Sequence, residues 1–277
     1  MWGPMMSGSD NRSCRDAGSP NDAERLSDAE CFSDAGRLSN GASFRYSGEE
    51  LPLMARAVHW KSYVAELIRP HLGPSVLEIG AGIGSNIPYL RHPPVREWTA
   101  VEPDADQAAQ IRDPGVCVIV GTIAAIDVTE RFDAILYLDV LEHLADDAAE
   151  LRRAVTHLVP GGRLIVLAPA HRWLTSPMDA AVGHYRRYSA AGLRALTPAG
   201  CRLEVLNYLD AVGCVASLAN RLLLRRTQIS AGQVRLWDGG LVPLSRRLDR
   251  WLGFRLGKSL LAVWRRTDAG AEQSGIS

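Results

Sequence analysis

Three glycines at alternate positions, Gly80, Gly82 and Gly84, follow an apolar stretch that has the pattern of a β-strand. Glycine permits positive φ and lets a ligand approach the backbone where a Cβ would collide, and a helix after such a turn points unpaired N–H groups at the ligand. A carboxylate, Glu78, lies two residues before the first glycine. It would repel a diphosphate but would suit a ligand that carries an ammonium and a sulfonium. The stretch therefore predicts a site for a positively charged, nucleotide-shaped cofactor.

A second carboxylate, Glu102, ends another apolar stretch and is followed by Pro103. It lies about 20 residues after the glycine turn, where dinucleotide-binding folds place the acid that accepts hydrogen bonds from a ribose diol. Dinucleotide folds, however, space their glycines as G-x-G-x-x-G, whereas the third glycine here comes one residue earlier. The spacing therefore favours a nucleoside without a diphosphate.

Together with two later stretches, these residues resemble the class I S-adenosylmethionine-dependent methyltransferases, whose first motif is an acid followed by G-x-G-x-G. The later stretches are residues 131–143, which end in Asp-Val-Leu-Glu-His, and residues 158–166, which contain a Pro-Gly-Gly turn expected to launch the fifth strand. The resemblance covers roughly residues 55–266. Within the family, the motifs most resemble those of quinone-biosynthesis-like and sugar- or lipid-modifying bacterial enzymes.

This resemblance implies an α/β fold: a Rossmann-like, seven-stranded, mostly parallel sheet with helices on both faces, an antiparallel last strand, and a helical insertion before that strand. The alternation of strand and helix patterns agrees with a parallel sheet. Strands are expected near residues 75–79, 97–101, 116–120, 132–138 and 162–168, with an antiparallel pair at 202–208 and 259–265. A helix within residues 51–72 is expected beside the cofactor as a partial lid.

The resemblance also implies S-adenosylmethionine as the cofactor and assigns its contacts. The expected cofactor-binding residues are Glu78, Gly80, Ala81, Gly82 and Gly84 for the methionine end, Glu102 and Pro103 for the ribose, and Leu138 and Asp139 for the wall near the sulfonium. Many relatives carry an acid after the third strand to read adenine, but here Gly121 and Thr122 follow it. We therefore expect Thr122 or the backbone to contact the adenine.

Methyl transfer requires mainly alignment of the reactants and exclusion of water, and a base is needed only if the acceptor must lose a proton. The candidates for catalytic groups are His143, His171, Asp179 and His184. His143 closes the Asp-Val-Leu-Glu-His run, where a structural role at the start of a helix is the alternative.

A tyrosine-flanked pair of arginines follows, and the expected substrate-binding residues are Arg186, Arg187 and Tyr188. They could clamp a carboxylate, a phosphate or sugar hydroxyls. The alternative is a structural network in which Asp179 pairs with one of the arginines.

The insertion, residues 211–257, combines arginines with Trp237, Trp251 and Phe254. This pattern suits peripheral contact with a membrane surface or a lipid-linked substrate, and the alternatives are a helical cap or a homodimer interface. No nucleic-acid-binding module is recognisable, so no nucleic-acid partner is expected. No stretch has the spacing of a metal site, and no metal is expected.

The 277 residues carry no net charge, and their apolar and charged fractions are those of an ordinary globular protein. Residues 1–50 are rich in Ser, Gly and Asp and are expected to be a disordered tail, as are residues 267–277, which leaves 51–266 as the catalytic domain. The five cysteines lack C-x-x-C spacing and indicate a reducing compartment. No apolar run of about 18 residues is present, so a cytoplasmic protein, at most peripheral at the inner membrane surface, is expected.

These observations predict an S-adenosylmethionine-dependent methyltransferase that acts on a small-molecule, sugar or lipid-linked acceptor through oxygen or nitrogen. Two alternatives remain. A nicotinamide-dependent oxidoreductase would share the sheet and the ribose-binding acid but not the glycine spacing. A non-catalytic module would bind S-adenosylmethionine without transferring its methyl group.

Overall fold

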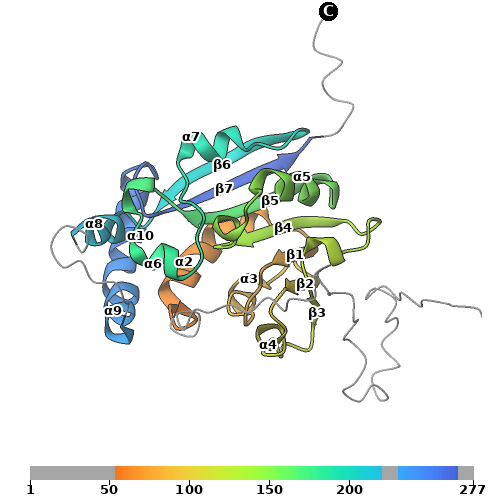
Figure 1. Ribbon diagram of the computed structural model, residues 1–277, viewed down its shortest axis with the longest axis horizontal. Helices are drawn as coiled ribbons and strands as arrows, with labels where there is room; N and C mark the ends of the chain where they lie inside the picture. Colours follow the sequence, from red (N-terminus) through yellow and green to blue (C-terminus); the bar gives the residue numbers. More distant parts are fainter. Residues whose placement is uncertain (1–53, 220–229, 268–277) are drawn as a thin grey trace, which may run out of the picture.

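Seven strands form one sheet in the order β3-β2-β1-β4-β5-β7-β6 (Figure 1). The computed structural model describes residues 54–219 and 230–267. The strands are β1 Ser75–Ile79, β2 Glu97–Glu102, β3 Val116–Val120, β4 Phe132–Leu138, β5 Leu158–Pro169, β6 Cys201–Leu209 and β7 Ser259–Arg266. The predicted Rossmann-like architecture is confirmed, including the antiparallel pairing at the end of the sheet.

The strand order places a binding site. β1 pairs in parallel with β2 on one side and with β4 on the other, so the chain reverses its direction of winding at β1. In open α/β sheets, ligands bind at such a switch point, beyond the carboxyl ends of the strands. β7 alone runs antiparallel to its neighbours, β5 and β6.

Alternate residues of the central strands point into two separate hydrophobic cores. Val76 contributes to one core and Leu77 to the other, and β4 alternates in the same way. The first core lies under α2 and α3, and the second lies under α5 and α7. The helices are α2 Val58–Ile68, α3 Ile87–Leu90, α4 Ala105–Ala108, α5 Asp147–Thr156, α6 Pro177–Ala181, α7 Ala190–Ala195, α8 Ala211–Ala219, α9 Ala231–Leu236 and α10 Val242–Trp251.

Two boundaries differ from the expectation. β5 begins at Leu158 instead of after the Pro-Gly-Gly sequence, because Leu158 already pairs with Phe132 and the glycines form an irregularity within the strand pairing. Gly161 there has a φ of 76°. The lid helix is also shorter than residues 51–72, since α2 gives way to a 3₁₀ turn at Arg69, where Pro70 follows.

The insertion is helical, as expected, and consists of α8, α9, a π-helical turn at Trp237–Leu241 and α10. Figure 1 shows these helices gathered with α2 at one end of the sheet. Arg221, Arg225 and Arg226, which contributed to the basic pattern of the insertion, lie outside the described residues, as do both expected tails except Thr267. The Thr267 N–H donates to the Gly200 carbonyl, so the described part of the chain reaches one residue past the expected boundary.

Candidate active site

The glycine turn has the backbone that its sequence predicts. Gly80, Gly82 and Gly84 have φ angles of 66°, 57° and 73°, in the region that favours glycine. A Cβ at Gly80 would lie 2.6 Å from Cγ2 of Val140. The N–H of Gly80 donates to the carbonyl of Val101 at 2.8 Å, so the turn is fixed to the end of β2.

Glu102 ends β2, and each of its carboxylate oxygens accepts a hydrogen bond from a backbone N–H group. Oε2 accepts from the Gly82 N–H at 2.8 Å, and Oε1 accepts from the Asp104 N–H at 2.9 Å. Burial raises the pKa of Glu102, and these two hydrogen bonds act in the opposite direction. A carboxylate has about four lone-pair sites, so each oxygen retains acceptor capacity for a hydroxyl group.

Glu78 is only 1% exposed and lies on the face of β1 that meets α2. Its Oε1 accepts from Nδ2 of Asn86 at 3.2 Å, whereas Oε2 is buried and makes no hydrogen bond of ordinary geometry. Burial raises its pKa to about 7, and Asn86, Lys61 and the nearby Trp98 indole oppose that rise. A buried acceptor without a partner is costly, so this oxygen is suited to a ligand that brings a donor.

Lys61, which was not among the predicted site residues, also lies here. Its Nζ donates to Oγ of Ser85 and to Oδ1 of Asn86, both at 2.9 Å. Burial lowers the pKa of Lys61, while the charges of Asp139 and Glu78 raise it. The signal that could have found it is that the chain has only two lysines, one of which falls on the predicted lid helix.

Asp139 follows β4 with a φ of 56°, and its N–H donates to the Leu167 carbonyl at 2.8 Å. Asp139 is exposed as a whole residue, yet burial of its carboxyl raises its pKa against the opposing charges of Lys61 and His184, among others. The exposure of the residue and the raised pKa are compatible, because part of Asp139 can touch solvent while protein surrounds its carboxyl group on most sides. The second lysine, Lys258, is another of these opposing charges, so both lysines of the chain act on Asp139.

The remaining predicted cofactor contacts have less distinctive surroundings. Ala81 and Leu138 are buried, and Pro103 is partly buried. Thr122 is exposed, and its Oγ1 accepts from the Ala124 N–H at 3.3 Å, which caps a 3₁₀ turn after β3.

Asp179 is buried at the centre of a polar network. Its carboxylate lies 2.9 Å from Nδ1 of His184 and accepts from Nε and Nη2 of Arg187 at 2.7 and 3.1 Å. Burial alone would raise the pKa of Asp179, but the hydrogen bonds from His184, Arg187 and the Ser176 backbone hold it well below its usual range. The structure thus brings two candidate catalytic residues together with one candidate substrate-binding arginine.

Arg186 and Tyr188 contact the loop that follows β4. Nη1 of Arg186 lies 2.9 Å from the Asp147 carboxylate, and the buried Tyr188 hydroxyl donates to the same carboxylate at 2.8 Å. These contacts fasten the segment around residue 186 onto the start of α5. In this arrangement the guanidinium groups of Arg186 and Arg187 and the Tyr188 hydroxyl are all engaged within the chain.

The two remaining candidate histidines are partly buried, and their pKa values are lowered. Burial and the nearby His184 lower the pKa of His143 to about 4, although a backbone hydrogen bond with Gly183 opposes this. Burial also lowers the pKa of His171, whose ring stacks on Tyr208 with centroids 4.9 Å apart. Nε2 of His171 is buried without a hydrogen-bond partner.

The sheet order, the glycine turn and the two carboxylates together define a Rossmann-like methyltransferase domain of class I. The sequence matches the model of a methyltransferase domain family over residues 53–204, and the chain belongs to this family. A search of curated proteins found no match to the chain.

Solved structures share the fold at low sequence identity. A structure of the Haloferax volcanii Trm112 methyltransferase activator in complex with a methyltransferase matches at 14% identity and TM-score 0.57, covering 82% of this chain and 100% of the other. An S-adenosylmethionine-dependent methyltransferase of Thermotoga maritima matches at 19% identity and TM-score 0.53, covering 79% and 94%. The cyclase SpnF matches at 15% identity and TM-score 0.52, covering 79% and 93%. Since SpnF is named for cyclisation, the fold alone does not determine the reaction.

Proposed function

We propose that the protein binds S-adenosylmethionine and transfers its methyl group to an oxygen or nitrogen of a small-molecule, sugar or lipid-linked acceptor. The observation that carries this proposal is Glu78, whose buried Oε2 makes no hydrogen bond of ordinary geometry and lies beside a turn of three left-handed glycines. The residues present fit this cofactor, because an ammonium group would satisfy Oε2 of Glu78 and the lone pairs that Glu102 retains would accept from hydroxyl groups. When bound, S-adenosylmethionine supplies an electrophilic methyl group on its sulfonium.

The residues of the chain would then bind and orient the two reactants. Glu78 would pair with the ammonium group, and Lys61 lies close enough to the same turn to bind the carboxylate of the same ligand. Glu102 would accept from the ribose hydroxyls with the lone pairs that its backbone donors leave. Leu138 and Asp139 would form the wall near the sulfonium, where a carboxylate favours positive charge.

A general base is required only for an acceptor that must lose a proton in the transfer. His171 is the best placed of the four candidates, because it follows β5 at the carboxyl edge of the sheet, burial lowers its pKa, and its buried Nε2 has no hydrogen-bond partner. Asp179 is a poor base, since its hydrogen bonds hold its pKa low. His143 and His184 form a separate arrangement that is considered below.

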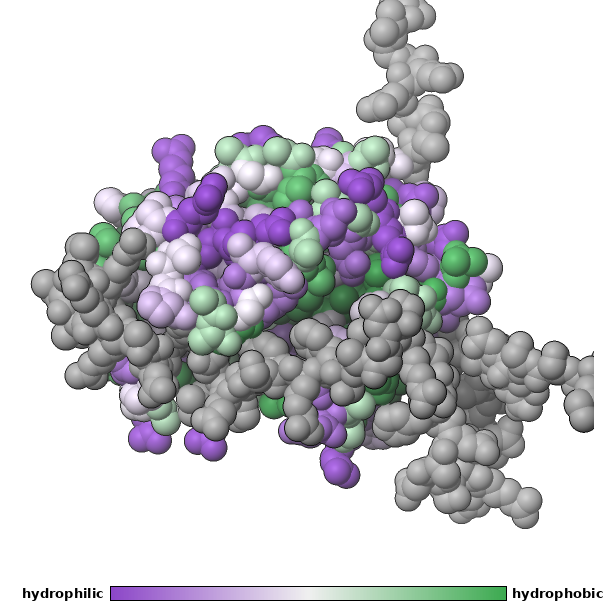
Figure 2. Space-filling model, in the orientation of Figure 1, coloured by the Kyte–Doolittle hydropathy of each residue, from purple (hydrophilic) through white to green (hydrophobic). Residues whose placement is uncertain are grey.

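The insertion supports an acceptor that is carried at a lipid surface. Five of its described large apolar residues are exposed: Val215, Leu236, Leu244, Leu256 and Trp251, the last at 81%. On the same helices, Arg246, Arg247 and Arg250 line a cavity of about 260 Å³. None of the described helices is long and apolar enough to cross a membrane, so contact would be peripheral. On the face drawn in Figure 2, hydrophobic patches are surrounded by hydrophilic residues.

Two measurements test the proposal. Calorimetric titration with S-adenosylmethionine and with NAD separates the methyltransferase from an oxidoreductase, because only the former compound should bind. Transfer of a labelled methyl group to cell extracts, divided into lipid and aqueous pools, then tests the reaction and the polarity of the acceptor. Binding without labelling of either pool would leave a non-catalytic module or another reaction on the same fold.

Vesicle sedimentation tests the lipid-surface contact separately. Anionic vesicles should carry the protein down, and Trp251→Ala should reduce the bound fraction, whereas Trp173→Ala, which removes an exposed tryptophan outside residues 211–257, should not. A homodimer through the same helices is the alternative, and it would appear as a concentration-dependent mass that Trp251→Ala abolishes.

A further inference from the structure

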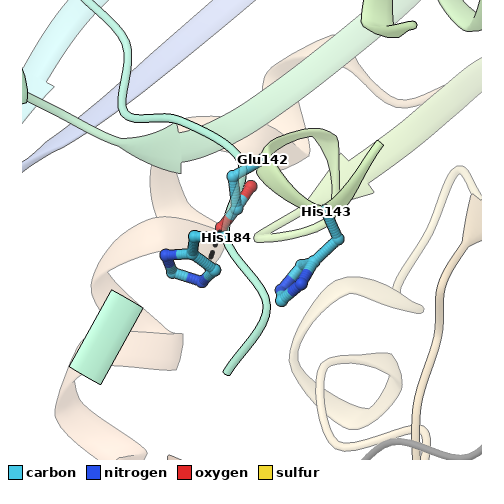
Figure 3. Close-up of side chains that lie close together, drawn as sticks. All are labelled: Glu142, His143 and His184. Atoms are coloured by element: carbon cyan, nitrogen blue, oxygen red, sulfur yellow. Dashed lines mark ion pairs between the residues drawn. The ribbon is translucent and has the colours of Figure 1, made fainter. Parts of the chain in front are cut away.

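Three potential metal ligands meet behind the carboxyl end of β4. Glu142 and His143 come from a 3₁₀ turn at Leu141–His143, and His184 comes from the loop after α6. One potential ligand atom from each lies within 4.8 Å of the others, and Figure 3 shows the Glu142 carboxylate beside both imidazole rings. Their separation of 41 residues along the chain explains why no ligand spacing was visible in the sequence.

Glu142 is the strongest indication that a ligand binds here. It is 1% exposed, and its Oε2 is buried without a hydrogen-bond partner. Oε1 lies 3.8 Å from Nε2 of His184, which is too long for a hydrogen bond. A buried carboxylate with an unused oxygen is costly unless a cation or a donor compensates for it.

The surroundings of His184 leave its other nitrogen available for a metal. Nδ1 lies 2.9 Å from Oδ1 of Asp179, a distance at which Nδ1–H donates to the carboxylate and Nε2 keeps its lone pair. Nε2 is the atom that faces Glu142. Asp179 is itself fixed by Arg187 and by Ser176. A carboxylate that orients a histidine in this way is the usual support of a metal-bound imidazole.

We propose that Glu142, His143 and His184 bind one divalent transition-metal ion, with Asp179 as the residue that positions His184. Two imidazoles and one carboxylate favour ions such as Zn²⁺, Co²⁺ or Fe²⁺ over Mg²⁺ and Ca²⁺, which prefer oxygen ligands. Bonds of about 2.1 Å require neighbouring ligand atoms roughly 3–3.5 Å apart, so the three side chains move closer together when the ion binds.

Three protein ligands leave at least one coordination position open. Asp139 precedes Glu142 by three residues along the chain, and its charge acts on both Glu142 and His184. If the proposed methyl transfer is correct, the open position is available to an oxygen of the acceptor, and this last step rests on the proposed function. The metal site itself does not depend on it.

The test is a Zn²⁺ titration of the full, tag-free chain after removal of metals with a chelator, with the stoichiometry checked by elemental analysis. One Zn²⁺ per chain should bind, and Glu142→Gln and His143→Gln should each weaken the affinity at least tenfold, which is about 1.4 kcal/mol. His92→Gln, which replaces an exposed histidine far from the cluster in sequence, should bind as the unmodified chain does. If Zn²⁺ instead bound to cysteines of the chain, its affinity would be the same in all of these variants.

Binding of less than roughly a tenth of an equivalent, or equal affinity in Glu142→Gln, His143→Gln and the unmodified chain, would overturn the proposal. Melting curves of the metal-free variants identify any that fail to fold, and Glu142→Gln preserves the shape of the side chain. S-adenosylmethionine titrations of the same samples keep the two proposals apart. If a variant loses Zn²⁺ binding but still binds S-adenosylmethionine, the result concerns the metal site alone. If the unmodified chain binds Zn²⁺ but does not bind S-adenosylmethionine, only the proposed function is refuted.

Discussion

Buried carboxylates occur in two regions of the molecule, and their surroundings differ. Beneath the insertion, Asp249 accepts from the Tyr63 hydroxyl and from the N–H groups of Asp210 and Ala211, at 2.7–2.9 Å. Asp210 is equally well bonded, to Gly213, Trp237, Ser245 and Lys258. At the carboxyl edge of the sheet, in contrast, Glu78 and Glu142 each keep a buried oxygen without a partner.

The difference separates structural acids from binding acids. Asp210 and Asp249 are satisfied within the chain, and they join α2, α8 and α10 to the end of β6. An acid of this kind stabilises the fold and has little acceptor capacity left for a ligand. Glu78 and Glu142 reduce stability as long as nothing binds them, which is a cost that a protein tolerates at a site where a ligand supplies the missing partner.

The largest effect is expected for Asp249→Ala. This change leaves two buried N–H groups and one hydroxyl without their acceptor, each of which costs about 1–3 kcal/mol, so the free energy of unfolding should fall by about 3 kcal/mol or more. Urea unfolding measures it. Asp127→Ala is the control, because Asp127 is exposed and should be nearly neutral. Equal effects of the two changes would show that the bonds beneath the insertion do not stabilise the fold.

Glu78→Gln, unlike Asp249→Ala, should increase the free energy of unfolding at high pH. Because the folded pKa of Glu78 is about 7 and its ordinary value is 4.5, the folded state keeps a proton that the unfolded state has lost, so stability falls between about pH 4.5 and 7 and stays lower above that range. The full difference corresponds to about 3 kcal/mol. The glutamine variant lacks this loss. Relative to the unmodified chain, it should therefore gain stability between pH 5 and pH 8 when both are unfolded in urea.

The same variant should bind S-adenosylmethionine at least tenfold more weakly, since the amide cannot neutralise an ammonium group. The unmodified chain is less stable above pH 7 because this carboxylate is buried, and it would regain stability on binding the cofactor. Glu78→Gln that neither changes the pH dependence nor weakens binding would place Glu78 with the structural acids.

Glu102→Ala should weaken the binding of S-adenosylmethionine at least tenfold, about 1.4 kcal/mol, because a charged acceptor for two hydroxyls is lost. Calorimetry measures the change. Glu97→Ala is the matched control, since Glu97 begins the same strand and its side chain is exposed. Unchanged affinity in Glu102→Ala would mean that its backbone donors already use the carboxylate fully, as at Asp249.

The backbone of the glycine turn could be predicted from the sequence, because its determinants are local. Gly80, Gly82 and Gly84 each indicate a positive φ at their own position. Glu78 and Glu102 end or nearly end two predicted strands, at a set number of residues from the glycines. The strand positions were also predictable, since alternation along β1 and β4 assigns residues to two cores.

The remaining features depend on contacts between distant segments. His184 reaches Glu142 only because the loop after α6 folds back onto the end of β4, and no periodicity encodes that. Lys61 contacts Ser85 and Asn86 across two elements. The pairing of Asp179 with Arg187 was one of two alternatives for that segment, and only the packing of the loop distinguishes Arg187 from Arg186 as the partner.

The smallest effect expected is that of Tyr63→Phe, and it is the most direct comparison of the two kinds of acid. The phenol is buried, and both burial and its hydrogen bond to Asp249 raise its pKa, so it remains a neutral donor at all ordinary pH values. Its removal leaves Asp249 with two backbone donors and should cost about 1 kcal/mol in urea unfolding. Tyr185→Phe, on an exposed tyrosine, should cost almost nothing. A cost as large as that of Asp249→Ala would show that the two backbone donors cannot satisfy Asp249 by themselves, and that its difference from Glu78 depends on a single hydroxyl group.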